Sequence, residues 1–349
     1  MRKPIALIGL LLLSTLLPLK ALAVTFSRMY VFGDSLSDPG NLFNLTGGQI
    51  PPSPYFNGRF SNGPTWVEYL AQDLNLNPTP YTALTPASSP TQGINFAIAG
   101  ATTGTDNTIA PVLPGLRQQI GSFANLLSAN QPADPNALYV LWGGANDYLP
   151  TQSTTFTPFT TPNTSISNLS FALNSLVTLG ARNFLIANLP NLGSLPLTRT
   201  TQDSGRLNTL TSQHNTSLAT TLNTLDNTTA SNLNIRLVDV NSLFNNAISN
   251  PSQYGFTNIT DACINNLNCV AGGRSVQDQY LFWDDKHPST ATHKHIEELA
   301  YRQLQSEPEP VPEPASVMGT IVFGALATRW KLKHKSKKVS LVKGSKTVD

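Results

Sequence analysis

The sequence predicts an α/β fold in which a parallel sheet is covered by helices on both faces. Short apolar runs, rich in β-branched and aromatic residues, alternate with segments of helical periodicity from residue 26 to residue 304, a pattern typical of parallel α/β sheets. The runs are mostly apolar along their length, as expected for strands buried on both faces. Chemically distinctive residues directly follow several of these runs, at the edge where open parallel sheets bind ligands.

The first predicted strand covers residues 26–32 and ends at Gly33-Asp34-Ser35, which indicates a sharp turn. Residues 39–64 are rich in Pro, Gly and Asn and predict a loop. Residues 66–74 then show the apolar spacing of a helix that buries one face.

The rest of the chain repeats this alternation. Gly180 is expected to end one helix, because glycine readily adopts the left-handed conformation that closes a helix. Ser289 is expected to cap the last helix. Further strands are expected at residues 94–99, 137–142, 183–187 and 233–240, and further helices at residues 113–129, 165–179, 206–225, 242–248 and 289–304.

Charge is scarce and unevenly distributed. Only 12% of the 349 residues are charged, about half the usual share of soluble domains. Residues 24–306 contain 11 Lys and Arg against 16 Asp and Glu, a net charge of −5, so the positive balance of the whole chain comes from its two ends. This acidic body offers no basic patch for a phosphate backbone, and we expect no nucleic-acid partner.

The two ends predict export and membrane contact. Residues 1–23 have a basic start, an apolar run and the cleavage pattern Ala21-Leu22-Ala23, which indicates a signal peptide rather than an uncleaved anchor. One globular domain is expected at residues 24–305, followed by a Pro/Glu linker at residues 306–314. Residues 315–349 combine a short apolar segment with a basic tail, which predicts membrane contact.

Cys263 and Cys269 are the only cysteines. In an exported protein, an even number at short spacing predicts a disulfide. Two unpaired thiols are the alternative, whereas two cysteines alone do not form a zinc site.

Ser35, His287 and Asp284 are the candidate catalytic residues. A serine hydroxyl needs a general base, and Asp284 stands three residues before His287, where it could orient the imidazole. Asp285 is the competing orienter. We expect folding to bring residues 35 and 287 within hydrogen-bonding range.

Acyl transfer also needs donors directed at the developing oxyanion. The backbone N–H groups of Ser35 and Gly100 and the side-chain amide of Asn146 are the candidates. The Gly-x-Ser-x-Gly elbow of ordinary α/β-hydrolases is absent from the sequence.

Four blocks in this order resemble the GDSL lipases/esterases, or SGNH hydrolases: Gly33-Asp34-Ser35-Leu36, Asn95-Phe96-Ala97 with Gly100-Ala101, Gly144-Ala145-Asn146-Asp147, and Asp284-x-x-His287. The resemblance covers residues 26–304. It implies a three-layer α/β/α sandwich with a five-stranded parallel sheet in the flavodoxin-like arrangement. It also implies Ser35 as nucleophile, His287 as base, Asp284 as its orienter, and an oxyanion hole formed by Ser35, Gly100 and Asn146.

These residues predict a secreted serine hydrolase that cleaves carboxylic esters as a lipase, an esterase or a phospholipase. The reaction is expected to proceed through an acyl-enzyme, without a cofactor or metal. An acyl chain is expected to lie near Leu36, Phe56 and Phe60. Three alternatives stay open: a carbohydrate O-acetylesterase on the same triad, metal-assisted phosphoester hydrolysis with Asp34, Asp284 and His287 as ligands, and a non-catalytic envelope-binding protein.

The C-terminal end has a resemblance of its own. Val311-Pro312-Glu313-Pro314, followed by an apolar run and a basic end, is similar to the PEP-CTERM sorting signal of bacteria. This resemblance implies processing by an exosortase-type membrane protease, with simple membrane anchoring as the alternative.

Overall fold

The centre of the protein is a parallel sheet in the order β2-β3-β1-β4-β5-β6. The computed structural model describes residues 25–127, 131–228 and 232–306, so the predicted signal peptide, most of the linker and the C-terminal tail lie outside the described residues. The strands are β1 (Met29–Gly33), β2 (Thr79–Pro80), β3 (Gly93–Asn95), β4 (Leu138–Trp142), β5 (Asn183–Ala187) and β6 (Asn234–Val238).

The five predicted strands are all present, but the expected number of strands in the sheet was wrong by one. The sixth strand, β2, has only two residues and pairs with β3 at the edge. A segment that short carries no periodic pattern in the sequence. Without β2, the order is β3-β1-β4-β5-β6. If these five strands are counted along the chain, this is the order 2-1-3-4-5 of the flavodoxin-like arrangement, with a switch point beside β1.

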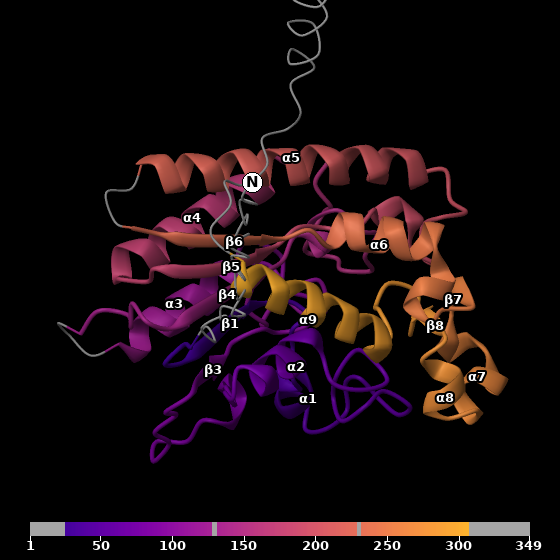
Figure 1. The fold of residues 1–349 in the computed structure, drawn as a ribbon, viewed down its shortest axis with the longest axis horizontal. Helices are drawn as coiled ribbons and strands as arrows, with labels where there is room; N and C mark the ends of the chain where they lie inside the picture. The colour runs from indigo at the N-terminus through magenta and orange to yellow at the C-terminus, as the bar shows by residue number, and fades with distance from the viewer. Residues whose placement is uncertain (1–24, 128–130, 229–231, 307–349) are drawn as a thin grey trace, which may run out of the picture.

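Helices cover both faces of the sheet and form the expected three layers (Figure 1). One face packs against α2 (Trp66–Asp73), α6 (Val240–Ser249) and α9 (Thr290–Gln305). The other face packs against α3 (Leu116–Leu126), α4 (Asn163–Leu179) and most of α5 (Ser204–Thr228). A short helix, α1 (Asn41–Leu45), follows β1, and 3₁₀ turns lie at Tyr81–Ala83, Ala145–Asp147, Leu192–Ser194, Pro251–Tyr254 and Cys263–Asn265.

Alternation along the strands divides the core into two layers. Met29 and Val31 of β1 point into the layer beneath α2 and α9, whereas Tyr30 and Phe32 point into the opposite layer. Side chains in a strand point to opposite faces in turn, so a strand buried on both faces must be apolar at every position. All five residues of β1 are buried, and the same holds for β4.

Two predicted helix boundaries have the expected chemistry. Gly180 is left-handed, with φ 119°, and ends α4. Ser289 caps α9, and its side chain accepts a hydrogen bond from the amide of Thr292. The position of Ser289 also fixes the segment that precedes it, which contains His287.

A separate two-stranded sheet with its own short helices lies at the end of the molecule where β6 leads into α6 (Figure 1). It contains the paired strands β7 (Asn258–Ala262) and β8 (Tyr280–Phe282) and the short helices α7 (Leu267–Ala271) and α8 (Arg274–Gln277). The predicted disulfide between Cys263 and Cys269 is present here, buried against Trp283. Within the described residues, no helix is both long and apolar enough to cross a membrane.

Candidate active site

Ser35 lies at the carboxyl end of β1, beside the switch point of the sheet. Gly33 makes this turn possible, because a Cβ atom at this position would lie 2.3 Å from the carbonyl oxygen of Trp142 on β4. The backbone of Gly33 is also held by Gln119, whose side chain accepts from its N–H at 2.9 Å and donates to its carbonyl at 2.8 Å. The backbone that leads to Ser35 is therefore fixed by close contacts of β1 with β4 and with α3.

His287 lies on the segment between β8 and α9, which is fastened on both sides. The amide of Trp283 donates to the carbonyl of His287 at 2.9 Å, and Ser61 donates to the carbonyl of Pro288 at 2.9 Å. Asn62 accepts from the amide of Thr290 at 2.8 Å. The loop that precedes α2 therefore fixes the backbone of the segment that contains His287.

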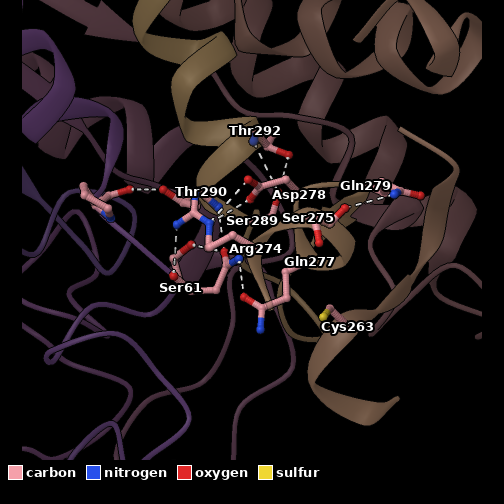
Figure 2. Close-up of polar contacts among 12 residues, drawn as sticks. Ser61, Cys263, Arg274, Ser275, Gln277, Asp278, Gln279, Ser289, Thr290 and Thr292 are labelled. Atoms are coloured by element: carbon pink, nitrogen blue, oxygen red, sulfur yellow. Dashed lines mark hydrogen bonds and ion pairs between the residues drawn. The ribbon is translucent and has the colours of Figure 1, made fainter. Parts of the chain in front are cut away.

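A polar cluster behind this segment joins the same loop to α8. Asn62 donates to Gln277 at 3.1 Å and its carbonyl accepts from Arg274 at 3.4 Å. Figure 2 shows the side chains of α8 lying beside Ser61 and Thr290 at the start of α9. The region formed by β7, β8, α7 and α8 thus contributes to the position of His287, but it does not line the cleft described below.

Ser35, His287 and Asp284 form a continuous hydrogen-bonded chain. The Oγ of Ser35 lies 2.7 Å from Nε2 of His287, and Nδ1 of His287 lies 2.6 Å from Oδ2 of Asp284. The three residues are at most 7% exposed. Asp285 holds the loop instead, since its carbonyl accepts from the amide of Leu197. The structure therefore brings together the predicted three residues, with Asp284 rather than Asp285 on the imidazole.

Asp284 is held as a charged carboxylate. Its Oδ1 accepts from the amides of Lys286 and His287 at 2.9 and 2.7 Å, and its Oδ2 accepts from the hydroxyl of Tyr55 at 2.7 Å. Burial raises the pKa of a carboxyl group, but the attraction of His287 and these hydrogen bonds outweigh burial and hold the pKa of Asp284 below its usual value. An ionised Asp284 keeps the proton of the imidazole on Nδ1 and leaves Nε2 free to accept the serine proton.

The backbone N–H groups of Ser35 and Gly100 have no protein acceptor among the described residues. Gly100 has φ +79°, a left-handed conformation that directs the chain around the end of β3. The side-chain amide of Asn146 donates to the carbonyl of Ala101 at 3.0 Å and lies 3.4 Å from Oδ2 of Asp34. Ser35 and Asn146 line the same cleft, and the contact of Asn146 with Ala101 places its amide next to the residue that follows Gly100.

Two buried aspartates fix the loop that contains Gly100. Asp38 accepts from the amide of Ala99 at 2.9 Å and also from amides at the start of α1. Asp147 accepts from the amide of Thr103 at 2.9 Å and from its hydroxyl at 2.6 Å. Asp147 is thus a structural anchor on the far side of Gly100. Its position next to Asn146 in the sequence does not by itself reveal this role.

Asp34 is buried beside the nucleophile with few donors. Its Oδ1 accepts from the amide of Leu36 at 3.0 Å. Burial raises the pKa of Asp34 to about 7, because this hydrogen bond and the attraction of His287 only partly compensate the loss of hydration.

An apolar cleft opens next to Ser35 and His287. It has a volume of about 470 Å³, including the space open to solvent. Besides the catalytic residues, its walls contain Leu36, Trp142, Leu149, Pro190, Leu192, Leu195 and Phe244. The predicted acyl-chain contacts are partly wrong: Leu36 lines the cleft, whereas Phe56 is 39% exposed and absent from it, and Phe60 packs 5.1 Å from the ring of His287.

The candidate metal ligands Asp34, Asp284 and His287 are not arranged as a metal-binding group in the described part of the chain. Among the described residues, no group of three His, Cys, Asp or Glu side chains is arranged to hold a metal. Both ring nitrogens of His287 are occupied, one by Ser35 and one by Asp284. Within the described part of the chain, the three ligands expected for metal-assisted phosphoester hydrolysis are therefore not grouped around a common point.

Known proteins share this sequence pattern. Residues 29–300 match the family described as GDSL-like Lipase/Acylhydrolase. The chain is 29% identical to the thermolabile hemolysin of Vibrio parahaemolyticus, over 78% of this chain and 62% of that protein, so it spans less than two thirds of that relative's length. It is 28% identical to the phosphatidylcholine-sterol acyltransferase of Aeromonas hydrophila, over 81% of this chain and 92% of the relative. It is 29% identical to a GDSL esterase/lipase of Arabidopsis thaliana, over 79% and 87% of the two chains.

Proposed function

The chain belongs to the GDSL-like lipase/acylhydrolase family, a family of carboxylic ester hydrolases, and from this premise we propose that Ser35 is the nucleophile of an esterase or lipase. The observation that supports this proposal most directly is the chain of contacts from Ser35 through His287 to Asp284, at 2.7 and 2.6 Å. Each contact has the length expected of a nucleophile, its general base and the group that orients the base.

In the proposed reaction, Oγ of Ser35 attacks the ester carbonyl while Nε2 of His287 takes the hydroxyl proton. Asp284 stabilises the resulting imidazolium and holds its orientation. His287 then returns the proton to the departing alcohol, which leaves an acyl group on Ser35. Water, activated by the same imidazole, releases the acid and restores the serine.

The negative charge that develops on the carbonyl oxygen needs donors that are already in place. The N–H groups of Ser35 and Gly100 are suited to this role because no protein acceptor within the described residues occupies them. Asn146 would supply the third donor from its side-chain amide. One such donor typically contributes about 10²–10³ in turnover.

The apolar lining of the cleft favours an ester with an acyl chain over a small acetylated sugar. Leu149, Leu192 and Leu195 form an aliphatic wall suited to an acyl chain, and Asn146 and Lys286 are among the few polar residues that also line the cleft. A carbohydrate O-acetylesterase remains the second candidate function, since the same triad would remove an acetyl group. One relative is named for its action on phosphatidylcholine, so phospholipids belong in the substrate panel.

The enzyme is proposed to act outside the cytoplasm. The signal-peptide pattern of residues 1–23 supports export. The disulfide between Cys263 and Cys269 also supports export, because disulfides persist in oxidising compartments. Membrane contact through residues 315–349 and exosortase-type processing rest on the sequence of the tail alone, and the mass of the mature protein would test both.

Substitution of Ser35 by alanine tests the proposed function. We expect Ser35→Ala to lower turnover of p-nitrophenyl esters by several orders of magnitude, because the nucleophile is removed while its surroundings are kept. Ser37→Ala is the matched control: this serine is two residues away, and its hydroxyl accepts from the indole of Trp66 rather than contacting His287.

The substrate panel includes p-nitrophenyl acetate, butyrate and octanoate, phosphatidylcholine vesicles and acetylated xylan. A fluorophosphonate probe should label wild type but not Ser35→Ala, and a chelator should leave activity intact. Ester hydrolysis that persists in Ser35→Ala, or the absence of labelling in active wild type, would refute the nucleophile assignment. A preference for acetylated xylan would favour the second candidate.

A further inference from the structure

Tyr55 contacts the catalytic carboxylate from a loop far away in the sequence. Its hydroxyl donates to Oδ2 of Asp284 at 2.7 Å, and this is the same oxygen that binds Nδ1 of His287 at 2.6 Å. Tyr55 and Asp284 are 229 residues apart in the chain. The hydroxyl and the imidazole therefore share one carboxylate oxygen at the centre of the site.

We propose that Tyr55 is a positioning residue that fixes Asp284 in its catalytic orientation through this hydrogen bond. This inference rests on the proposed function, since it gives Tyr55 a role only through Asp284 and His287. Tyr55 does not line the cleft, so the inference gives it no contact with the substrate.

The hydrogen bonds of Asp284 explain why one hydroxyl matters. An ionised carboxylate offers about four acceptor sites. Two are taken at Oδ1 by the amides of Lys286 and His287, and two at Oδ2 by His287 and Tyr55. With all four sites filled, rotation of the carboxylate would break hydrogen bonds on both oxygens. Loss of the hydroxyl would leave one acceptor of a buried anion unpaired, which is costly because water cannot replace it freely.

The ring of Tyr55 is itself fixed in place. It packs edge-on against Phe60 with ring centroids 5.7 Å apart, and against Trp283 with centroids 6.2 Å apart. Trp283 is buried against the disulfide, and Phe60 packs on the ring of His287. The loop that contains Tyr55 and Phe60 thus contacts both members of the imidazole–carboxylate pair. The hydroxyl of Tyr55 donates to Asp284, and the ring of Phe60 packs against His287.

Tyr55 remains a donor over the working pH range. Burial raises the pKa of its hydroxyl, and the neighbouring negative charge of Asp284 raises it further. In turn, donation from Tyr55 is one of the effects that keep the pKa of Asp284 low. The other titratable or charged groups at this position are His287 on the carboxylate, and Asp285 and Lys286 next to it in the chain.

The direct test is Tyr55→Phe, which removes the hydroxyl and keeps the ring between Phe60 and Trp283. We expect kcat to fall roughly tenfold to a hundredfold with KM within about twofold, as is typical when a partner that orients a reactive group is lost. The acid side of the kcat/KM profile should also move to higher pH, because Asp284 would become protonated at a less acidic pH.

Tyr69→Phe is the matched control. Tyr69 also has a partly buried hydroxyl, which lies 2.8 Å from Oγ1 of Thr290 at the start of α9 and does not contact Asp284. We expect this variant to keep the kcat and the pH profile of wild type. Chemical denaturation of both variants would report any difference in stability.

A double-mutant cycle separates positioning from a general structural effect. If Tyr55 acts through Asp284, Tyr55→Phe should cost less than twofold in an Asp284→Ala background, although it costs at least tenfold in wild type. Equal losses in both backgrounds, or a Tyr55→Phe variant as active as Tyr69→Phe, would overturn the proposal. Full activity of Asp284→Ala alone would instead refute the catalytic role of Asp284, and with it the proposed mechanism.

Discussion

Substitution of Gly100 by alanine connects backbone geometry to catalysis at a single position. Gly100 has φ +79°, and a Cβ atom there would lie 2.6 Å from Oδ1 of Asn107 and 2.7 Å from Cγ1 of Ile109. Alanine is strained in this conformation, and one of the two neighbours has to move. Both effects act on the N–H group that is proposed to bind the oxyanion.

The loss of stability can be worked out in two parts. The left-handed conformation costs an alanine roughly 1–2 kcal/mol relative to glycine. Asn107 cannot withdraw freely, because its Oδ1 accepts from the amide of Ile109 at 2.9 Å and its amide donates to the carbonyl of Ala99 at 2.9 Å. Breaking one of these hydrogen bonds adds roughly 1–3 kcal/mol. We expect Gly100→Ala to lower the free energy of unfolding by about 2–5 kcal/mol.

The loss of activity should exceed what unfolding alone explains. Displacing one oxyanion donor typically lowers turnover by about 10²–10³. We expect kcat for p-nitrophenyl butyrate to fall by about 10² at a temperature where the variant is folded, with little change in KM. Active-site titration with a fluorophosphonate would normalise the rates to folded enzyme, and urea denaturation would measure stability.

Gly121→Ala is the control for this experiment. Gly121 lies inside α3, and a Cβ atom there would have no neighbour within 4 Å. Alanine in an exposed helix interior should raise the free energy of unfolding by roughly 0.5–1 kcal/mol and leave kcat unchanged. A Gly100→Ala enzyme that is destabilised but has wild-type kcat would refute the oxyanion role. One with unchanged stability would refute the argument from backbone geometry.

Two further predictions concern stability. Burial raises the pKa of Asp34 from 3.8 to about 7. The contribution of this carboxyl group to the free energy of unfolding is therefore fully present below about pH 4 and is lost as the pH rises through 7. We therefore expect Asp34→Asn to reduce the fall in unfolding free energy between pH 5 and pH 8 in urea denaturation, and an unchanged slope would contradict this. Replacing Cys263 and Cys269 together by serine opens a loop with a sequence separation of 6 and should lower the free energy of unfolding by about 2 kcal/mol; a loss below 0.5 kcal/mol would show that this cross-link contributes little.

Local sequence was sufficient to predict the main layers of the fold. The strands β1, β4 and β5 appear where buried apolar runs predicted them, because a strand covered on both faces is apolar along most of its length. The strand β6 also lies within its predicted range, although Arg236 interrupts its apolar run. Helix ends at Gly180 and Ser289 also followed from single residues with known conformational or hydrogen-bonding preferences. The short elements β2, α7 and α8 were not predicted, because two to five residues carry too little periodicity.

Some predicted boundaries differ from those of the structure by a few residues. The strand expected at residues 94–99 ends as β3 at Asn95, although the amides of Phe96 and Ile98 still bond to the backbone of β1. The helix expected at residues 206–225 extends over Ser204–Thr228.

For the site, the sequence by itself determined the identity of the chemical groups. Ser35, Asp284, His287, Gly100 and Asn146 could each be singled out from the blocks that contain them. Only the tertiary structure decided which groups meet: that Asp284 rather than Asp285 faces the imidazole, that Tyr55 shares its oxygen, and that residues from β4, α6 and residues 190–195 form the cleft. The physical reason is that local sequence encodes backbone preferences over a few residues. Contacts across 229 residues depend on how the whole sheet and its two helical layers pack.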